Sequence, residues 1–218
     1  MVLREIAERY CSRSFSNKEV PDEIIKDILE AARLAPSWVN TQPWHFIVVK
    51  DKRNKALLSQ LAHGQPHVEE ASAVIVCCGD KSAWEDENFR KTLESRKGIT
   101  PERVEALLKT RGFNPKLKGE DAIIYRTLEE ITYPVAYMTI EAEKNGVGAC
   151  VIGWIGNELT ESVPEVYELV KNTLNLPDNL IVMALLAVGY KKETQEKLEK
   201  IRKSFNEIVS WDFFGNKK

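Results

Sequence analysis

The sequence lacks an excess of charge of either sign, because its 218 residues carry 31 Lys and Arg against 33 Asp and Glu. A net charge of −2 argues against a strongly basic nucleic-acid-binding protein and against an acidic disordered chain. No apolar run approaches the roughly 18 residues that cross a membrane. The longest extends only from Leu180 to Tyr190. We therefore expect neither nucleic acid nor a membrane as a partner.

Signals for export are also absent. The first five residues contain no apolar core and no small-residue cleavage site of a secretory signal. The four cysteines are Cys11, Cys77, Cys78 and Cys150, and they form no CxxC pair. Cys77-Cys78 lies inside an apolar run, which is typical of reduced core thiols. These features favour a cytoplasmic, reducing compartment, although the spacing alone leaves a disulfide open.

Residues that carry chemistry by themselves are few. His63 and His67 are four positions apart, but a glycine and a proline between them argue against a helix, so we expect no metal site. No HExxH, GxSxG or GxxxxGK(S/T) motif occurs. Gly146-x-Gly148 lacks the third glycine of a dinucleotide fingerprint. If the chain is an enzyme, we expect a bound cofactor to supply the chemistry.

A regular succession of apolar segments is present. β-Branched and aromatic runs predict strands, and apolar residues at helical spacing predict helices. No linker interrupts them, so we expect one domain over residues 1–218. A variable helical excursion at about 81–118, rich in Lys, Arg and Glu, is either a solvated insert or a lid over a site. The predicted strands are 44–49, 73–79 and 180–189, and the predicted helices are 21–35, 51–62, 121–144, 164–171 and two short ones in the excursion.

The segment 121–144 has the strongest helical periodicity. Its opposite side is also apolar, with Tyr133 and Tyr137 among others, so we expect a central helix or one at a subunit interface. The apolar stripe steps by four and three residues through Ile124, Leu128, Ile131, Val135, Met138 and Ala142.

Three stretches of the sequence resemble the nitroreductase family, the FMN-dependent NAD(P)H oxidoreductases. Residues 9–20, RYCSRSFSNKEV, resemble the family's R-x-S-x-(R/K)-x-F motif. Residues 31–44, AARLAPSWVNTQPW, are similar to its A-x-x-A-P-S-x-x-N-x-Q-P-W signature, which is the most specific match. Gly189-Tyr190, Lys200-x-Arg202 and residues 205–209 resemble its closing strand, phosphate-binding basic residues and C-terminal extension. Residues 146–153 look like its glycine-containing flavin loop.

The resemblance implies an α+β fold of three layers. A central mixed, mainly antiparallel sheet is flanked by helices, and a long central helix lies at the interface of a homodimer. It also implies one FMN at each of two interface sites. NAD(P)H delivers a hydride to the flavin, which passes electrons to a small-molecule acceptor of nitroaromatic or quinone type by a ping-pong mechanism. Two alternatives stay open: a specialised branch (dehalogenation, flavin destruction or another flavin oxidation), and a flavin-binding protein without turnover.

The resemblance also assigns roles to residues. Arg9 and the basic pair Lys200 and Arg202 match phosphate contacts, Arg13 matches the cation near flavin N1, and the Gly153 N–H is the candidate for N5. The loop 36–40 is expected to contact the flavin of the other subunit. No protein side chain is expected to be catalytic, since flavin N5 carries the chemistry. The expected cofactor-binding residues are Arg9, Tyr10, Cys11, Arg13, Pro36, Ser37, Trp38, Asn40, Gln65, Val151, Ile152, Gly153, Lys200 and Arg202.

Four residues depart from the family's usual pattern. Tyr10 and Cys11 replace a basic or small polar residue and a serine, so that one hydroxyl donor to the phosphate is lost. Trp38 and Val39 are bulkier than usual, which predicts a narrower pocket for the acceptor.

Overall fold

The computed structural model describes residues 2–193 and 200–217 and contains every predicted strand and helix. The strands are β1 (Trp44–Val49), β2 (Ala73–Asp80), β3 (Gly148–Ile152) and β4 (Leu180–Gly189). The helices are α1 (Arg4–Glu8), α2 (Asp22–Arg33), α3 (Lys52–Leu61), α4 (Pro66–Glu70), α5 (Asp86–Glu94), α6 (Pro101–Leu108), α7 (Glu120–Lys144), α8 (Pro164–Leu174) and α9 (Phe205–Ile208), with short 3-10 helices at Trp38–Asn40, Lys81–Trp84 and Pro115–Lys118.

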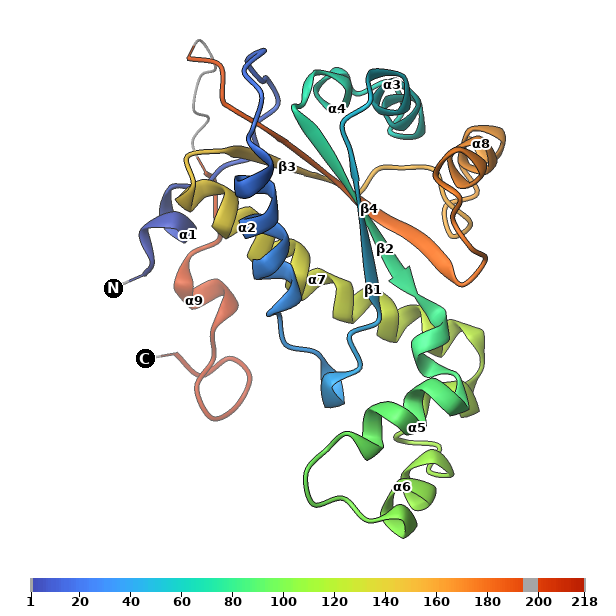
Figure 1. Ribbon diagram of the computed structural model, residues 1–218. Coiled ribbons are helices and arrows are strands. Elements are labelled where there is room, and N and C mark those ends of the chain that lie inside the picture. Colours follow the sequence, from blue (N-terminus) through green and yellow to red (C-terminus); the bar gives the residue numbers. More distant parts are fainter. Residues whose placement is uncertain (1, 194–199, 218) are drawn as a thin grey trace.

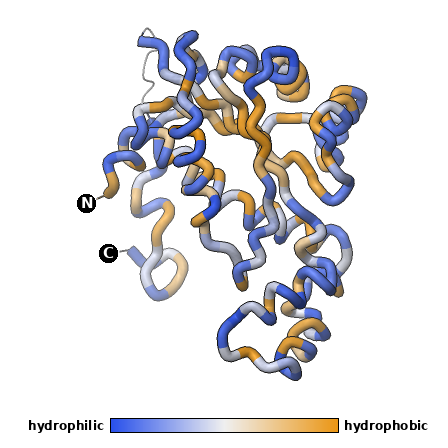
Figure 2. Tube along the Cα trace, in the orientation of Figure 1, coloured by the Kyte–Doolittle hydropathy of each residue, from blue (hydrophilic) through white to orange (hydrophobic). Residues whose placement is uncertain are grey.

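The described strands form one sheet in the order β1-β2-β4-β3, and all three pairings are antiparallel. Helices α2 and α7 cover one face, and α3, α4 and α8 cover the other (Figure 1). Both faces are therefore buried, which explains why β2 and β4 are apolar without alternation (Figure 2). The α+β, three-layer prediction is confirmed, and the parallel component is the isolated bridge between Cys11 and Ala149.

One prediction about this sheet is wrong. We expected residues 146–153 to be a loop, but residues 148–152 form the edge strand β3. Gly, Ala and Cys have little strand propensity, so the local pattern gives a weak signal. Pairing with β4, from Gly148 opposite Gly189 to Ile152 opposite Leu185, stabilises the extended conformation.

Helix α7 packs against the sheet over its C-terminal half as predicted. Val135 and Met138 are buried in the cluster beneath α2. Towards its N-terminus the predicted stripe is wrong, because Leu128 is exposed and the polar Thr127 and Glu130 are buried instead. In that half the helix faces the excursion and residue Trp38 rather than the sheet. The Thr127 hydroxyl accepts a hydrogen bond from the Trp84 indole N–H, and the Glu130 carboxylate accepts one from the Trp38 N–H. In the described residues no helix is long and apolar enough to cross a membrane.

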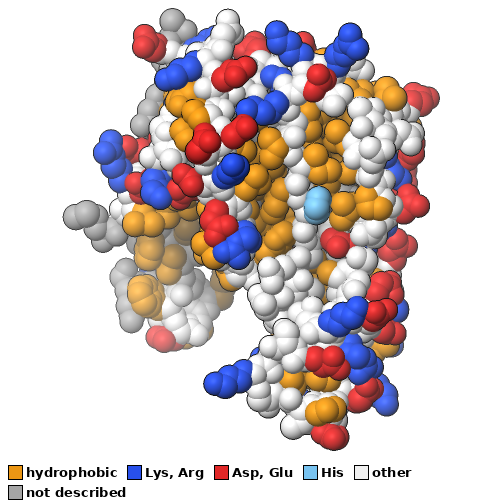
Figure 3. All heavy atoms as spheres, viewed as in Figure 1, with side chains coloured by type: hydrophobic (Ala, Val, Ile, Leu, Met, Phe, Trp, Pro, Cys, Tyr) orange, Lys and Arg blue, Asp and Glu red, His pale blue; other side chains and the backbone are white. Residues whose placement is uncertain are grey.

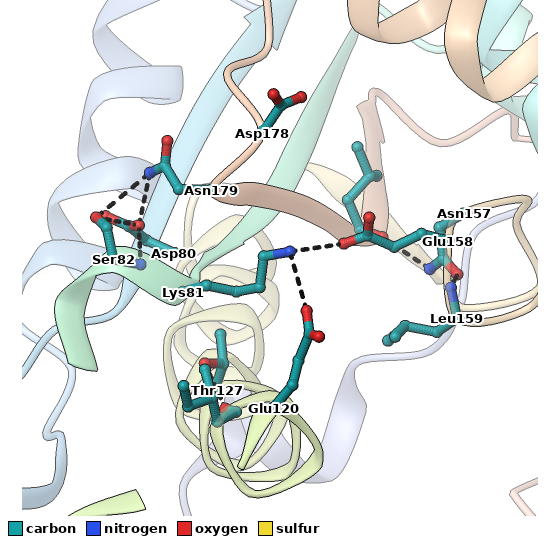
Figure 4. Close-up of polar contacts among 12 residues, drawn as sticks. Asp80, Lys81, Ser82, Glu120, Thr127, Asn157, Glu158, Leu159, Asp178 and Asn179 are labelled. Carbon is teal, nitrogen blue, oxygen red and sulfur yellow. Dashed lines mark hydrogen bonds and ion pairs between the residues drawn. The ribbon is translucent and has the colours of Figure 1, made fainter. Parts of the chain in front are cut away.

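The excursion, residues 81–118, projects from the foot of the sheet and has its own apolar cluster, which includes Trp84 and Phe89 (Figure 1). Its base is tied to the sheet by polar contacts (Figure 4). Asp80 accepts hydrogen bonds from the Ser82 N–H at 2.9 Å and from the Asn179 amide at 2.8 Å. Lys81 points between two carboxylates, 3.3 Å from Glu158 and 3.7 Å from Glu120.

Candidate functional site

The segment after α1 lies along the outer edge of β3. The Ser12 N–H donates to the Ala149 carbonyl at 3.1 Å, and the Ser16 N–H donates to the Tyr190 carbonyl at 2.8 Å. These backbone contacts bring four of the predicted cofactor-binding residues to one edge of the sheet: Arg9, Tyr10, Cys11 and Arg13. We call this region, residues 9–13 with β3 and Gly153, the β3 edge.

The β3 edge favours a negative charge at Cys11. A guanidinium nitrogen of Arg9 lies 3.8 Å from the Cys11 sulfur. The hydrogen bond from the Cys150 thiol, followed by the positive charges of Arg9 and Arg13, lowers the pKa of Cys11 to about 5. A place that stabilises a thiolate in this way also stabilises other anions, because the same charges act on both.

The two basic residues near the C-terminus lie in different surroundings. The ammonium of Lys200 contacts the carbonyl of Ala7, which lies in α1. Ala7 is two positions before Arg9 in the sequence. Arg202 is exposed and donates to the carbonyl of its own neighbour Ile201 at 2.8 Å. Lys200 therefore lies near the β3 edge, whereas the described contacts of Arg202 do not reach it.

The far end of β3 meets the turn between α3 and α4. The Gln65 amide donates to the carbonyls of Ala62 at 3.1 Å and Trp154 at 3.5 Å. The rings of His63 and Trp154 stack at 4.4 Å between centroids. A Cβ at Gly153 would meet no atom within 4 Å, so the backbone there faces open space. Gly153 and Gln65 are thus brought together at an open surface.

The loop 36–42 lies at the opposite edge of the sheet, because it leads into β1. Val39 and Asn40 adopt left-handed φ values of 49° and 64°, which cost energy in residues other than glycine. Two of the hydrogen bonds that hold the loop involve the side chains of Ser37 and Glu130. The Ser37 hydroxyl accepts from the Gln42 N–H at 3.0 Å, and buried Glu130 accepts from the Trp38 N–H at 2.8 Å. We call this segment the Trp38 loop.

Trp38 joins this loop to the excursion. Its ring lies 4.6 Å from Phe113 and about 6 Å from Trp84 and Phe89 between centroids. The Arg126 guanidinium lies 4.8 Å from the same ring, which is a cation–π geometry. The Trp38 loop therefore shares one apolar cluster with the excursion.

A model of the nitroreductase family matches residues 6–190. The chain belongs to this family. It is an oxidoreductase, and an NADH dehydrogenase of Thermus thermophilus is 30% identical to it over 204 residues, which cover 94% of this chain and 92% of the relative.

Two solved structures support the nitroreductase fold. A nitroreductase-like protein from Streptococcus mutans is 25% identical, with a TM-score of 0.77 over 95% of this chain and 96% of that chain. A protein from Exiguobacterium sibiricum, described as a nitroreductase in complex with FMN, is 26% identical, with a TM-score of 0.70 over 95% of each chain.

Apart from Lys200 and Arg202, the predicted site residues fall into two groups on one chain. The β3 edge gathers Arg9 to Arg13 with Val151 and Gly153, and Gln65 lies beside them. Ile152 is buried in the core, so that its side chain faces away from any ligand. The second group, Pro36, Ser37, Trp38 and Asn40, lies at the β1 edge, and strands β4 and β2 separate it from β3.

Sequence reasoning missed several residues that shape these regions. Buried Glu130 was passed over, although a carboxylate three residues after Thr127 and four before Pro134 falls on the buried side of α7. That periodicity was the signal that could have found it. The His63–Trp154 stack and the Cys11–Cys150 contact join distant segments and have no local signal.

Proposed function

We propose that this nitroreductase is an FMN-dependent enzyme that takes a hydride from NAD(P)H and reduces nitroaromatic or quinone-type acceptors by a ping-pong mechanism. The observation that carries the proposal is the β3 edge, where the Arg9 guanidinium lies 3.8 Å from the Cys11 sulfur and the backbone at Gly153 faces open space. The FMN complex of the Exiguobacterium protein and the name of the Thermus relative support the choice of cofactor and donor.

The residues present fit a flavin phosphate. A phosphate dianion needs cations and backbone donors, and Arg9 with Arg13 offer two guanidinium groups beside an edge strand. Cys150 and Gly153 are three residues apart on an extended chain, or about 10 Å, so an elongated cofactor spans the edge from the cations to the open backbone. FMN, when bound, would supply hydride transfer between donor and acceptor.

The roles of this chain's residues follow from their positions. Arg9 and Arg13, with Lys200 nearby, would hold the phosphate. This moves Arg13 from flavin N1, the role that the family resemblance implies, because both arginines act on Cys11. Gln65 would donate to a polar ring edge. The open backbone at Gly153 would orient the reactive part of the cofactor without a side chain in the way. Protons for the reduced acceptor would come from water, because a Cβ at Gly153 would meet no side chain within 4 Å.

We further propose that the enzyme is a homodimer with FMN at the interface. The two groups of site residues lie at opposite edges of one sheet, and a two-fold partner offers a way to bring them together. Large apolar side chains remain exposed on α7 (Tyr125, Tyr133, Tyr137) and near the C-terminus (Phe205, Phe213, Phe214). Figure 3 shows a gap between the C-terminal segment and the excursion, with apolar side chains on the C-terminal segment.

The proposal is tested by the visible spectrum of the protein loaded with FMN, recorded before and after anaerobic addition of NADH or NADPH. We expect one flavin per chain, bleaching by at least one nicotinamide, and return of colour with a quinone or a nitroaromatic compound. Initial rates at varied donor and acceptor should give parallel double-reciprocal lines. A protein that binds no FMN overturns the proposal, and intersecting lines overturn the ping-pong mechanism.

The homodimer is tested by size-exclusion chromatography with light scattering, and the measured mass should be twice the mass of one chain. Tyr133→Glu and Tyr137→Glu, which place charges on the exposed face of α7, should weaken the dimer and lower FMN affinity together. A monomer that binds FMN with full affinity overturns the interface site.

A further inference from the structure

Two cysteine thiols from distant parts of the chain meet at the β3 edge. Cys11 forms a bridge with Ala149, and Cys150 is the next residue on β3. Cys11 packs against the buried cluster that contains Cys150, so the two side chains lie on the same side of the β3 edge. Both are free cysteines in the structure. The contact joins one partly exposed sulfur to one buried sulfur.

The two thiols differ in chemical character. Cys11 is half-buried beside Arg9 and Arg13, and its pKa is lowered, so that it is a thiolate at neutral pH. Donation of a hydrogen bond to Cys11, together with burial, raises the pKa of Cys150, which therefore remains a thiol. A partly exposed thiolate next to a second thiol is the arrangement found in redox-reactive cysteine pairs.

The other two cysteines provide an internal contrast. Cys77 and Cys78 lie in the central strand β2 with no exposed surface. Burial raises the pKa of Cys77, and it raises the pKa of Cys78 to about 12. Cys77 lies in the cluster under α2 and α7, and Cys78 lies in the cluster under α3, α4 and α8, so a solute in water cannot reach either sulfur.

We propose that Cys11 and Cys150 form a peroxide-reactive pair that closes to a disulfide. The Cys11 thiolate attacks a hydroperoxide oxygen: an S–O bond forms, the O–O bond breaks, and the alcohol or water leaves with a proton from solvent. The Cys150 thiol then attacks the sulfenic sulfur. An S–S bond forms, and the hydroxyl leaves as water with the Cys150 proton. Two thiols are oxidised by two electrons, and one hydroperoxide is reduced.

The backbone geometry suits the disulfide. A disulfide needs Cα atoms about 4.4–6.8 Å apart. Neighbouring strands lie about 4.8 Å apart and rise about 3.3 Å per residue, so the residue beyond a bridged partner lies about 6 Å away. Cys150 stands in that relation to Cys11. Regular strand alternation would point the two side chains to opposite faces. Cys11 departs from that alternation, because it forms only an isolated bridge and packs against the cluster that contains Cys150. Closure would draw the Cys11 sulfur towards the core and away from Arg9.

The pair has a consequence for the cofactor, which rests on the proposed function. A phosphate at Arg9 and Arg13 would compete with the Cys11 thiolate for the same positive charges. Bound FMN should therefore slow the oxidation of Cys11, and the FMN-free protein should be the more sensitive form.

The test is thiol counting on the full-length protein, with and without saturating FMN, after treatment with hydrogen peroxide and capping with N-ethylmaleimide. We expect two of the four thiols to be lost and a peptide map to show a Cys11–Cys150 cross-link. Cys150→Ser should instead leave a sulfenic acid on Cys11 that dimedone traps. Cys11→Ser should abolish the reaction, and Cys78→Ala serves as the matched control that reacts like the unmodified chain.

The pH profile separates a reactive thiolate from an ordinary thiol. The ionisable groups that face Cys11 are Arg9 and Arg13 on its own segment and Cys150 on β3, and Lys191 after β4 lies over the adjacent Tyr10 ring. An ordinary thiol is roughly 80-fold less ionised at pH 6 than at pH 8. The oxidation rate of Cys11 should fall less than about threefold over that range.

The outcomes separate the thiol pair from the cofactor site. Retention of four thiols, a cross-link that involves Cys77 or Cys78, or an ordinary pH profile overturns the pair. If the Cys11–Cys150 cross-link forms but FMN does not slow it, the reactive pair is supported. Only the placement of the phosphate at Arg9 and Arg13 is then contradicted. Because the cross-link is read in the unmodified chain, the result does not depend on a variant that folds poorly.

Discussion

The β3 edge and the Trp38 loop lie at opposite edges of the same sheet and are built by different forces. At the β3 edge, backbone hydrogen bonds hold a segment that carries two arginines and a thiolate beside open space. At the Trp38 loop, an aromatic cluster and a buried carboxylate hold a strained backbone. One region is polar and open, and the other is apolar and packed.

This difference suggests a division of labour within the proposed dimer. Cations and backbone donors suit the recognition of a charged cofactor, which is the same in every turnover. An aromatic loop joined to a peripheral excursion suits contact with varied acceptors, because peripheral elements have low local stability and can adjust to different ligands. Four experiments test whether the two regions are independent, in order of decreasing expected effect.

Phe89→Ala should have the largest effect, because it should destabilise the excursion and the Trp38 loop without destabilising the sheet. Phe89 is fully buried in the excursion cluster, and removing such a ring costs about 3–5 kcal/mol. Amide hydrogen exchange should speed up in residues 81–118 and in the Trp38 loop while β2 and β4 keep their protection. Leu117→Ala, at an exposed side chain of the same excursion, is the control with little effect. Equal loss of protection in β2 would show that both regions unfold as one unit.

Arg9→Ala should affect only the β3 edge. A charge-assisted hydrogen bond contributes about 1.5–3 kcal/mol, so the Kd for FMN should rise roughly 10- to 100-fold. Fluorescence titration of FMN measures this change. Arg4→Ala is the matched control, since Arg4 pairs with Glu8 on the exposed side of α1. An unchanged Kd would remove Arg9 from the phosphate site.

Replacement by alanine should destabilise the protein at Gly148 and have little effect at Gly153. A Cβ at Gly148 would lie 2.6 Å from the Ser12 hydroxyl, so Gly148→Ala should cost about 1–3 kcal/mol and displace the segment that carries Arg9. Gly153→Ala meets nothing and should change stability by less than about 0.5 kcal/mol. Urea unfolding compares the two variants. Similar losses would contradict the proposed packing of Ser12 on β3.

Glu130→Gln should give the smallest effect, visible in its pH dependence. Burial raises the pKa of Glu130 above its ordinary value of 4.5, so the folded protein binds this proton more tightly than the unfolded chain. Wild-type stability therefore falls as pH rises from about 4.5 through the raised pKa. Gln keeps an oxygen for the Trp38 N–H and has no charge to bury, so the variant should gain about 1 kcal/mol relative to wild type by neutral pH.

The measurement for this variant is the melting temperature between pH 4 and pH 8. Glu129→Gln is the control, because Glu129 is exposed and pairs with Arg126. A variant whose stability follows the wild-type curve at every pH would show that Glu130 does not titrate in this window.

Local patterns predicted most of the fold, whereas the site residues are predictions from the family resemblance. The run 73–79 is β-branched and continuous, and it forms β2. The two excursion helices follow their apolar spacing and form α5 and α6. The predictions that were wrong involve weak local signals. β3 is extended through pairing with β4, and Glu130 rather than Leu128 is buried because the Trp38 loop offers it a partner.

By itself, the sequence determined the strands β1, β2 and β4, the longer helices and the family motifs, because each depends on residues within a few positions of one another. The balanced charge follows from composition alone. Only the tertiary structure decided which of these motifs meet. It placed Cys11 beside Cys150, Trp38 beside Phe113, and the two halves of the site at opposite edges of the sheet. The physical reason is that strand order and packing join residues distant in sequence, and periodicity along the chain carries no information about such pairs.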